Sequence, residues 1–228
     1  MSAGTSARDT ILKLVLGVLF LPAMLFLPAG TLDWPEAWLY LVIQLSTVGA
    51  MAVWMWKNSP GLLAKRASFK MPVRGWDRAF IALCIVLILP MFVIPGLDAV
   101  RYRWSQTPFA LKLVGFIGVV ASMIPVFLSM KVNPHASKIV EIEKDSKQKV
   151  ITTGPYSFVR HPMYLGFIVL FVSVPLALGS LYALIPGLGY VILIVWRTYL
   201  EDKTLLQELP RYEEYARKVR FRLLPGVW

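Results

Sequence analysis

Two polar clusters interrupt an otherwise apolar chain of 228 residues, and both contain side chains that can do chemistry. In the first, Arg160 and His161 directly precede Pro162 and a long apolar run. Proline is favoured in the first turn of a helix, so these two side chains would lie at a helix N-terminus. Exposed N–H groups and the helix dipole favour an anion there, such as a carboxylate or a phosphate. The structural alternatives are that Arg160 is an ordinary anchor at the membrane interface and that His161 caps the helix.

The second cluster follows the last apolar run and contains Arg197, Glu201 and Asp202. Arg197 and Glu201 are four residues apart and share one helix face, whereas Asp202 points about a quarter-turn away. An exposed pair of this kind contributes only about 0.2–0.5 kcal/mol. An ionisable residue at the end of a membrane span is costly and is more often functional. The pair is therefore a candidate site, with a surface ion pair as the alternative.

The composition defines the elements that must position these clusters. The chain is 57% hydrophobic and 16% charged, against about 45–50% and about 25% in soluble domains. This excess of apolar residues predicts an integral membrane protein and excludes a disordered chain. Cys84 is the single cysteine, so a disulfide scaffold is excluded as well.

A membrane-spanning helix needs about 20 mostly apolar residues, and six segments qualify or come close. They are residues 11–27, 37–56, 78–94, 109–130, 164–178 and 181–196. The predicted fold is all-α, a polytopic transmembrane helical bundle with a cytoplasmic loop and a C-terminal amphipathic helix. Five spans are the alternative, because only Gly179 and Ser180 separate the last two short segments. The first segment could instead be a cleaved signal peptide, although its length and Pro22 favour a span.

Charged residues predict the orientation. Lysine and arginine gather after the second and fourth segments and in the tail, and short basic loops are typically cytoplasmic. Both termini would therefore face the cytoplasm, and the net charge of +11 would attract anionic lipid headgroups. No nucleic-acid motif accompanies this charge. Two histidines and one cysteine without ligand spacing give no metal site.

Taken together and in this order, the clusters resemble the isoprenylcysteine carboxyl methyltransferase family and related integral membrane methyltransferases, including phospholipid methyltransferases. The matching features are Gly154-Pro155-Tyr156, the stretch from Val159 to Gly166, the segment from Arg197 to Asp202 and the ending from Tyr212 to Pro225. The resemblance implies methyl transfer from S-adenosylmethionine at the cytoplasmic membrane face. The expected acceptor is lipophilic, first of all the carboxylate of a prenylcysteine-like substrate.

The resemblance also implies roles for single residues. Arg197 and Glu201 would be catalytic. The residues expected to bind the cofactor are Tyr156, Val159, Arg160, His161, Tyr164, Gly166 and Asp202. The family usually has Glu-Glu where this chain has Glu201-Asp202, which keeps the charge but shortens the reach. Residues 1–130 would be scaffold helices and a substrate access region, and residues 131–228 the cofactor-binding and catalytic region of one integral unit.

The acceptor decides what these residues must do. A carboxylate is already ionised at neutral pH and needs only to be positioned, for which Arg197 is the candidate, while Arg160 or His161 would bind the carboxylate of the cofactor. Glu201 could orient Arg197 or accept hydrogen bonds from the cofactor. An amine acceptor would need a base, either Glu201 or His161.

Other functions remain open from the sequence. A phospholipid or other small-lipid N- or O-methyltransferase would need a similar site. An NADPH-dependent enzyme of the sterol-reductase type has similar C-terminal helices. A non-enzymatic transporter or membrane scaffold is disfavoured, because the spans contain almost no ionisable residues that could form a pathway.

Within the cytoplasmic loop, residues 139–152 are predicted to form a short hairpin or an extended segment. The tail residues Tyr212 and Tyr215 are predicted to lie on a surface helix and to anchor it at the membrane.

Overall fold

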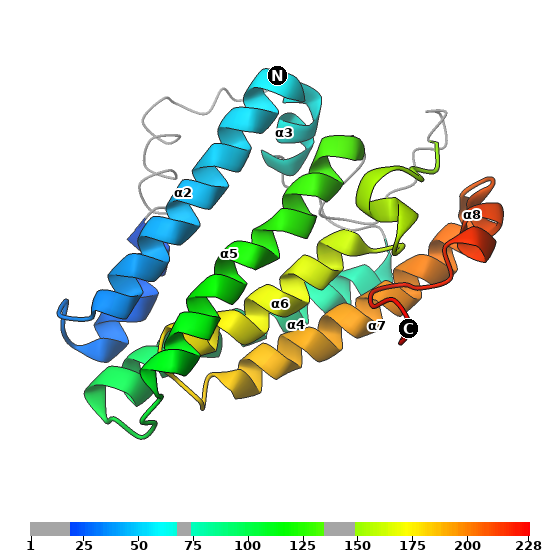
Figure 1. Cartoon of the computed structure of the whole chain (residues 1–228). Helices are drawn as coiled ribbons and strands as arrows, with labels where there is room; N and C mark the ends of the chain where they lie inside the picture. Colours follow the sequence, from blue (N-terminus) through cyan, green and yellow to red (C-terminus); the bar gives the residue numbers. More distant parts are fainter. Residues whose placement is uncertain (1–18, 68–73, 135–148) are drawn as a thin grey trace, which may run out of the picture.

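A computed structural model describes residues 19–67, 74–134 and 149–228, and all regular structure in these ranges is helical (Figure 1). The elements are the helix Leu19–Ala29, α2 (Pro35–Asn58), α3 (Pro60–Ala67), α4 (Gly75–Pro95) with its π-helical continuation η1 (Gly96–Arg101), α5 (Phe109–Val132), the 3-10 turn η2 (Gly154–Ser157), α6 (Pro162–Ala177), α7 (Leu184–Glu208) and α8 (Tyr212–Lys218).

The predicted fold class, a polytopic helical membrane protein, is confirmed. Four helices are long and apolar enough to cross a membrane, namely α2, the continuous unit Gly75–Arg101, α5 and α7. Two shorter apolar helices, Leu19–Ala29 and α6, correspond to the first and fifth predicted segments. With 16 residues, α6 is shorter than the roughly 20 residues that a straight span requires.

The sixth predicted apolar segment, residues 181–196, falls largely within α7, which begins at Leu184 and continues without a break to Glu208. This continuation agrees with the helix face predicted for Arg197 and Glu201. The sequence becomes polar at Arg197, yet Arg197 and Asp202 are buried against other parts of the protein. The helix therefore carries the second cluster directly out of the apolar region.

Two other predictions concern segments that the structure describes only in part. The predicted hairpin at residues 139–152 lies mostly outside the described residues, and residues 149–152 form neither helix nor strand. Of the first predicted segment, residues 11–18 also lie outside, while the helix from Leu19 covers the remainder.

The long helices pack in the order α2, α5, α6, α7 and α4, with α5 and α6 forming the most extensive pair. Glycines permit this close approach, as is common between membrane helices. A Cβ atom added at Gly166 would lie 2.6 Å from the carbonyl oxygen of Ser122 and 2.7 Å from Cγ2 of Val126. Gly166 therefore faces α5.

Buried polar contacts fix the end of the bundle formed by η1 and the turn between α6 and α7. The fully buried Asp98 accepts hydrogen bonds from the hydroxyls of Ser105 at 2.8 Å and Ser180 at 2.5 Å. The opposite end contains α3, η2, α8 and the C-terminus (Figure 1). The residues with candidate chemistry gather at this second end.

Candidate active site

The backbone at the start of α6 presents the first cluster. His161 is the N-cap residue and Pro162 opens the helix, as predicted. The backbone N–H groups of Arg160 and His161 donate to the carbonyl oxygens of Phe221 at 3.0 Å and Arg222 at 2.9 Å. These bonds attach the C-terminal segment to the helix start. The His161 side chain makes no capping hydrogen bond, so the capping explanation for this residue is wrong.

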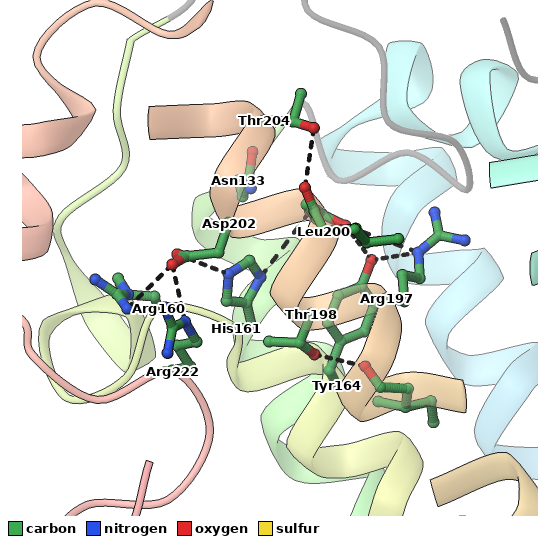
Figure 2. A network of polar contacts seen from close by, with 12 residues as sticks. Asn133, Arg160, His161, Tyr164, Arg197, Thr198, Leu200, Asp202, Thr204 and Arg222 are labelled. Carbon is green, nitrogen blue, oxygen red and sulfur yellow. Dashed lines mark hydrogen bonds and ion pairs between the residues drawn. The ribbon is translucent and has the colours of Figure 1, made fainter. Parts of the chain in front are cut away.

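Asp202 is the centre of a buried network, here called the Asp202 cluster (Figure 2). Its carboxylate is fully buried and lies 3.1 Å from Nη2 of Arg160 and 2.9 Å from Nε of Arg222. The hydroxyl of Tyr212 donates to it at 2.9 Å, and Nε2 of His161 lies 3.4 Å away. One side chain thus joins α7 to the start of α6, to α8 and to the C-terminal segment.

The charges of this cluster do not cancel, because two guanidinium groups face one carboxylate. The Arg160 side chain is only 7% exposed, whereas that of Arg222 is 26% exposed. Within the part of the chain that the structure describes, the buried Nε of Arg160 has no hydrogen-bond partner. A buried donor beside an excess of positive charge suits an anionic ligand group such as a carboxylate.

Three tyrosines close this side of the site. Burial and the neighbouring Asp202 raise the pKa of Tyr212. Burial raises the pKa of Tyr156 and of Tyr215 as well. Their hydroxyls therefore stay protonated, and that of Tyr215 donates to the carbonyl oxygen of Tyr156 at 2.7 Å. The prediction that Tyr212 and Tyr215 are membrane anchors is wrong, because both side chains are buried and bonded inside the protein.

A second network, here called the Arg197 cluster, comprises Arg197, Tyr164, Glu201 and Asp77. Nε of Arg197 donates to the Tyr164 hydroxyl at 2.8 Å, and this hydroxyl donates to Oε2 of Glu201 at 2.5 Å. Nε of Arg197 also lies 3.7 Å from the same carboxylate oxygen, which confirms that the two residues share a helix face. Arg197 is only 4% exposed, so it is not part of a solvated surface pair.

The fourth member of the Arg197 cluster was not predicted. Asp77, in the first turn of α4, lies 2.9 Å from Nη1 of Arg197 and is 1% exposed. One turn further along α4, the ring of Phe80 lies under the guanidinium, with 4.3 Å between Cζ and the ring centroid. An acidic residue at the start of an apolar helix was the only signal for Asp77 in the sequence.

His161 and Tyr164 connect the two networks (Figure 2). Their rings are stacked, with centroids 5.7 Å apart and an angle of 4° between the planes. Nδ1 of His161 lies 4.0 Å from Oε1 of Glu201, on the side of the ring away from Asp202. As the quarter-turn between them predicts, Glu201 and Asp202 therefore face two different groups of side chains.

The predicted site residues divide into two sets. Arg160, His161, Tyr164, Arg197, Glu201 and Asp202 lie together in the two clusters. Val159 directly precedes Arg160, and its side chain is buried. The hydroxyl of Tyr156 accepts a hydrogen bond from Nδ2 of Asn133 at 3.0 Å. Gly166 lies in the contact with α5, and its role in cofactor binding stays a prediction. No group of three or more metal-ligating side chains occurs among the described residues.

The fold and this site define a helical membrane protein with a buried, charged centre at one end of its bundle. Residues 111–210 match the family model described as phospholipid methyltransferase. Relatives include a protein-S-isoprenylcysteine O-methyltransferase of Saccharomyces cerevisiae, 29% identical over 58% of this chain and 56% of the relative. Protein-S-isoprenylcysteine O-methyltransferase B of Arabidopsis thaliana is 26% identical over 55% of this chain and 61% of the relative.

A Delta(14)-sterol reductase of Mus musculus is also similar, with 27% identity over 42% of this chain and 24% of the reductase. The chain thus spans between about a quarter and three fifths of the length of these curated relatives. The expected resemblance is confirmed: the chain is similar to integral membrane methyltransferases of the isoprenylcysteine and phospholipid types.

Proposed function

We propose that this protein transfers a methyl group from S-adenosylmethionine to a lipophilic acceptor at the cytoplasmic face of a membrane. The proposed acceptor is the carboxylate of a prenylcysteine-like molecule. The observation that carries the proposal is the adjacency of two buried charged networks, connected by the stacked rings of His161 and Tyr164. The similarity to the methyltransferases of yeast and Arabidopsis supports it.

The donor set fits this cofactor. S-Adenosylmethionine carries a carboxylate at one end and, when bound, supplies the methyl group from a positively charged sulfonium. The Asp202 cluster, with its excess of guanidinium groups and the unpaired Nε of Arg160, would hold the carboxylate. In the Arg197 cluster, Asp77 and Glu201 place two carboxylates beside the guanidinium, and carboxylates at this end would stabilise the positive charge of the sulfonium.

The remaining work of the site is alignment and exclusion of water. A carboxylate acceptor needs no proton removed at neutral pH, so a donor that orients it is sufficient. Arg197 is the proposed donor, and the Tyr164 hydroxyl keeps its Nε directed toward Glu201. Burial of Arg197 and Asp202 removes competing water, which strengthens each of these interactions.

Titration of S-adenosylhomocysteine into the detergent-purified protein tests the proposal. We expect saturable binding that His161→Ala and Glu201→Ala both weaken. Glu213→Ala is the matched control, because Glu213 forms an exposed ion pair with Arg217 on α8. Transfer of a labelled methyl group to N-acetyl-S-farnesylcysteine then tests the acceptor. If the folded wild-type protein binds no S-adenosylhomocysteine, the proposal is wrong.

Two comparisons favour specific alternatives. The phospholipid methyltransferase description allows an amine acceptor, for which Glu201 or His161 would serve as the base. Methyl transfer to phosphatidylethanolamine vesicles rather than to the farnesylcysteine probe would select that acceptor. The similarity to the mouse sterol reductase makes NADPH the second ligand to titrate. Binding of NADPH without S-adenosylhomocysteine would favour a reductase.

A further inference from the structure

We infer that Asp77 is a positioning residue for the proposed methyl transfer: it fixes the guanidinium of Arg197 from the side of α4. The inference rests on the proposed function and extends it, because Asp77 lies outside residues 111–210, where the family model matches. The site would then depend on the N-terminal half of the chain as well.

The two carboxylates beside Arg197 differ in how firmly they are held. Asp77 is 1% exposed and lies 2.9 Å from Nη1. Glu201 has a longer side chain, is 20% exposed and lies 3.7 Å from Nε. Glu201 also shares its carboxylate with the Tyr164 hydroxyl. Asp77 is therefore the permanent counter-ion, and Glu201 is the partner that an acceptor carboxylate can displace.

Phe80 completes the hold from α4. Its ring lies 4.3 Å from Cζ of Arg197 and covers the face of the guanidinium, while Oδ1 of Asp77 forms an ion pair with Nη1 at 2.9 Å without hydrogen-bond geometry. A guanidinium is planar, so the ring restricts its tilt and the carboxylate restricts the position of its charge. Asp77 would keep its place beside the guanidinium while an acceptor carboxylate takes the place of Glu201.

A second ion pair between the same two helices provides a matched control. Arg74 immediately precedes α4 and lies 2.8 Å from Glu208 at the end of α7, with side-chain exposures of 21% and 39%. This pair joins the same ends of the same helices but does not contact the Arg197 cluster. Glu208→Gln therefore tests whether the loss of any ion pair between α4 and α7 lowers the activity as much as the loss of the Asp77 carboxylate.

The test compares wild-type protein, Asp77→Asn, Asp77→Glu and Glu208→Gln in detergent. Methyl transfer to N-acetyl-S-farnesylcysteine gives kcat and KM, and titration gives the Kd for S-adenosylhomocysteine. We expect Asp77→Asn to lower kcat by about 10²-fold, because misplacement by about 1 Å can cost that much. Its Kd for S-adenosylhomocysteine should change less than threefold, since the Asp202 cluster is intact. Asp77→Glu should retain more activity than Asp77→Asn, and Glu208→Gln should match the wild type.

A double-mutant cycle on thermal unfolding provides a readout that needs no turnover. Asp77→Asn and Arg197→Gln should each lower the apparent Tm, and together they should lower it by less than the sum, because each single variant already removes the ion pair between the two residues. If Asp77→Asn does not fold, Phe80→Leu replaces it, with an expected loss in kcat on the order of threefold to tenfold.

The outcomes separate the two proposals. An active wild type beside an equally active Asp77→Asn overturns the positioning role alone, as do additive shifts in the cycle. A loss of activity in Glu208→Gln equal to that in Asp77→Asn also overturns it, because any link between the helices would then suffice. A wild type without turnover and without S-adenosylhomocysteine binding refutes the proposed function and the positioning role with it.

Discussion

Replacing Asp202 by asparagine would test whether the Asp202 cluster holds this end of the protein together. The substitution keeps the size of the side chain but removes its charge. Arg160, whose side chain is only 7% exposed, would lose its ion-pair partner. Arg222 is 26% exposed and can turn toward water, so its contribution is smaller.

The expected magnitude follows from the burial. Removing one partner of a buried ion pair typically costs about 3–5 kcal/mol. Asparagine retains an oxygen that can accept the Tyr212 hydroxyl, so the lower value, about 3 kcal/mol, is expected here. In a chain of this size, a loss of about 1 kcal/mol lowers the apparent Tm by about 2–4 °C, so Asp202→Asn should lower it by roughly 6–12 °C. Binding of S-adenosylhomocysteine should weaken at the same time, because Arg160 and His161 lose the group that orients them.

The assay is thermal unfolding in detergent, followed by tryptophan fluorescence, with S-adenosylhomocysteine titrated into the same samples. Glu213→Gln is the control, because it removes one negative charge from a pair that is 67% and 78% exposed on the neighbouring helix α8. Exposed pairs contribute about 0–1 kcal/mol, so its Tm should stay within about 2–4 °C of the wild type. If Asp202→Asn has the same apparent Tm as Glu213→Gln, the reasoning is refuted.

Three further predictions concern single contacts. Tyr164→Phe removes the hydroxyl that accepts from Arg197, so methyl transfer should fall by about 10-fold or more while S-adenosylhomocysteine still binds. Gly166→Ala should lower the apparent Tm by about 2–12 °C, since overpacking costs about 1–3 kcal/mol, whereas Gly49→Ala, with open space around the added methyl group, should not. Burial raises the pKa of Tyr212, so its contribution to stability is complete below the unfolded pKa of about 10 and is lost as the pH rises further. Between about pH 10 and 11, the apparent Tm of Tyr212→Phe should therefore fall less than that of the wild type, and equal slopes would contradict this.

Much of the fold could be predicted because a continuous apolar run of about 20 residues crosses a membrane as an α-helix. Six apolar segments became six apolar helices for this reason. The burial of Arg197 and Asp202 could not be predicted in this way, because a hydropathy pattern does not distinguish a polar residue in water from one buried against protein. Both side chains are buried, and the helix continues through them to Glu208.

Local geometry also predicted part of the site. Helix periodicity places Glu201 on the face of Arg197 and directs Asp202 elsewhere, and the structure gives the two carboxylates different partners. The identity of the distant partners could not be predicted in this way. Arg222 and Tyr212 reach Asp202 only because the chain turns back after α7, and no spacing in the sequence encodes that turn.

Asp77 is a different case, because a physical argument could have found it. A buried arginine at the end of a span needs more compensation than one glutamate at an i,i+4 position provides. The second carboxylate must come from another helix at the same end of the bundle. Among the acidic residues described before α5, Asp33 lies just before α2, Glu36 lies in its first turn and Asp98 lies in η1, all at the other end of the bundle. Asp77 lies in the first turn of α4. Matching charges at each end of the bundle therefore selects Asp77 from the N-terminal helices, which motif spacing does not.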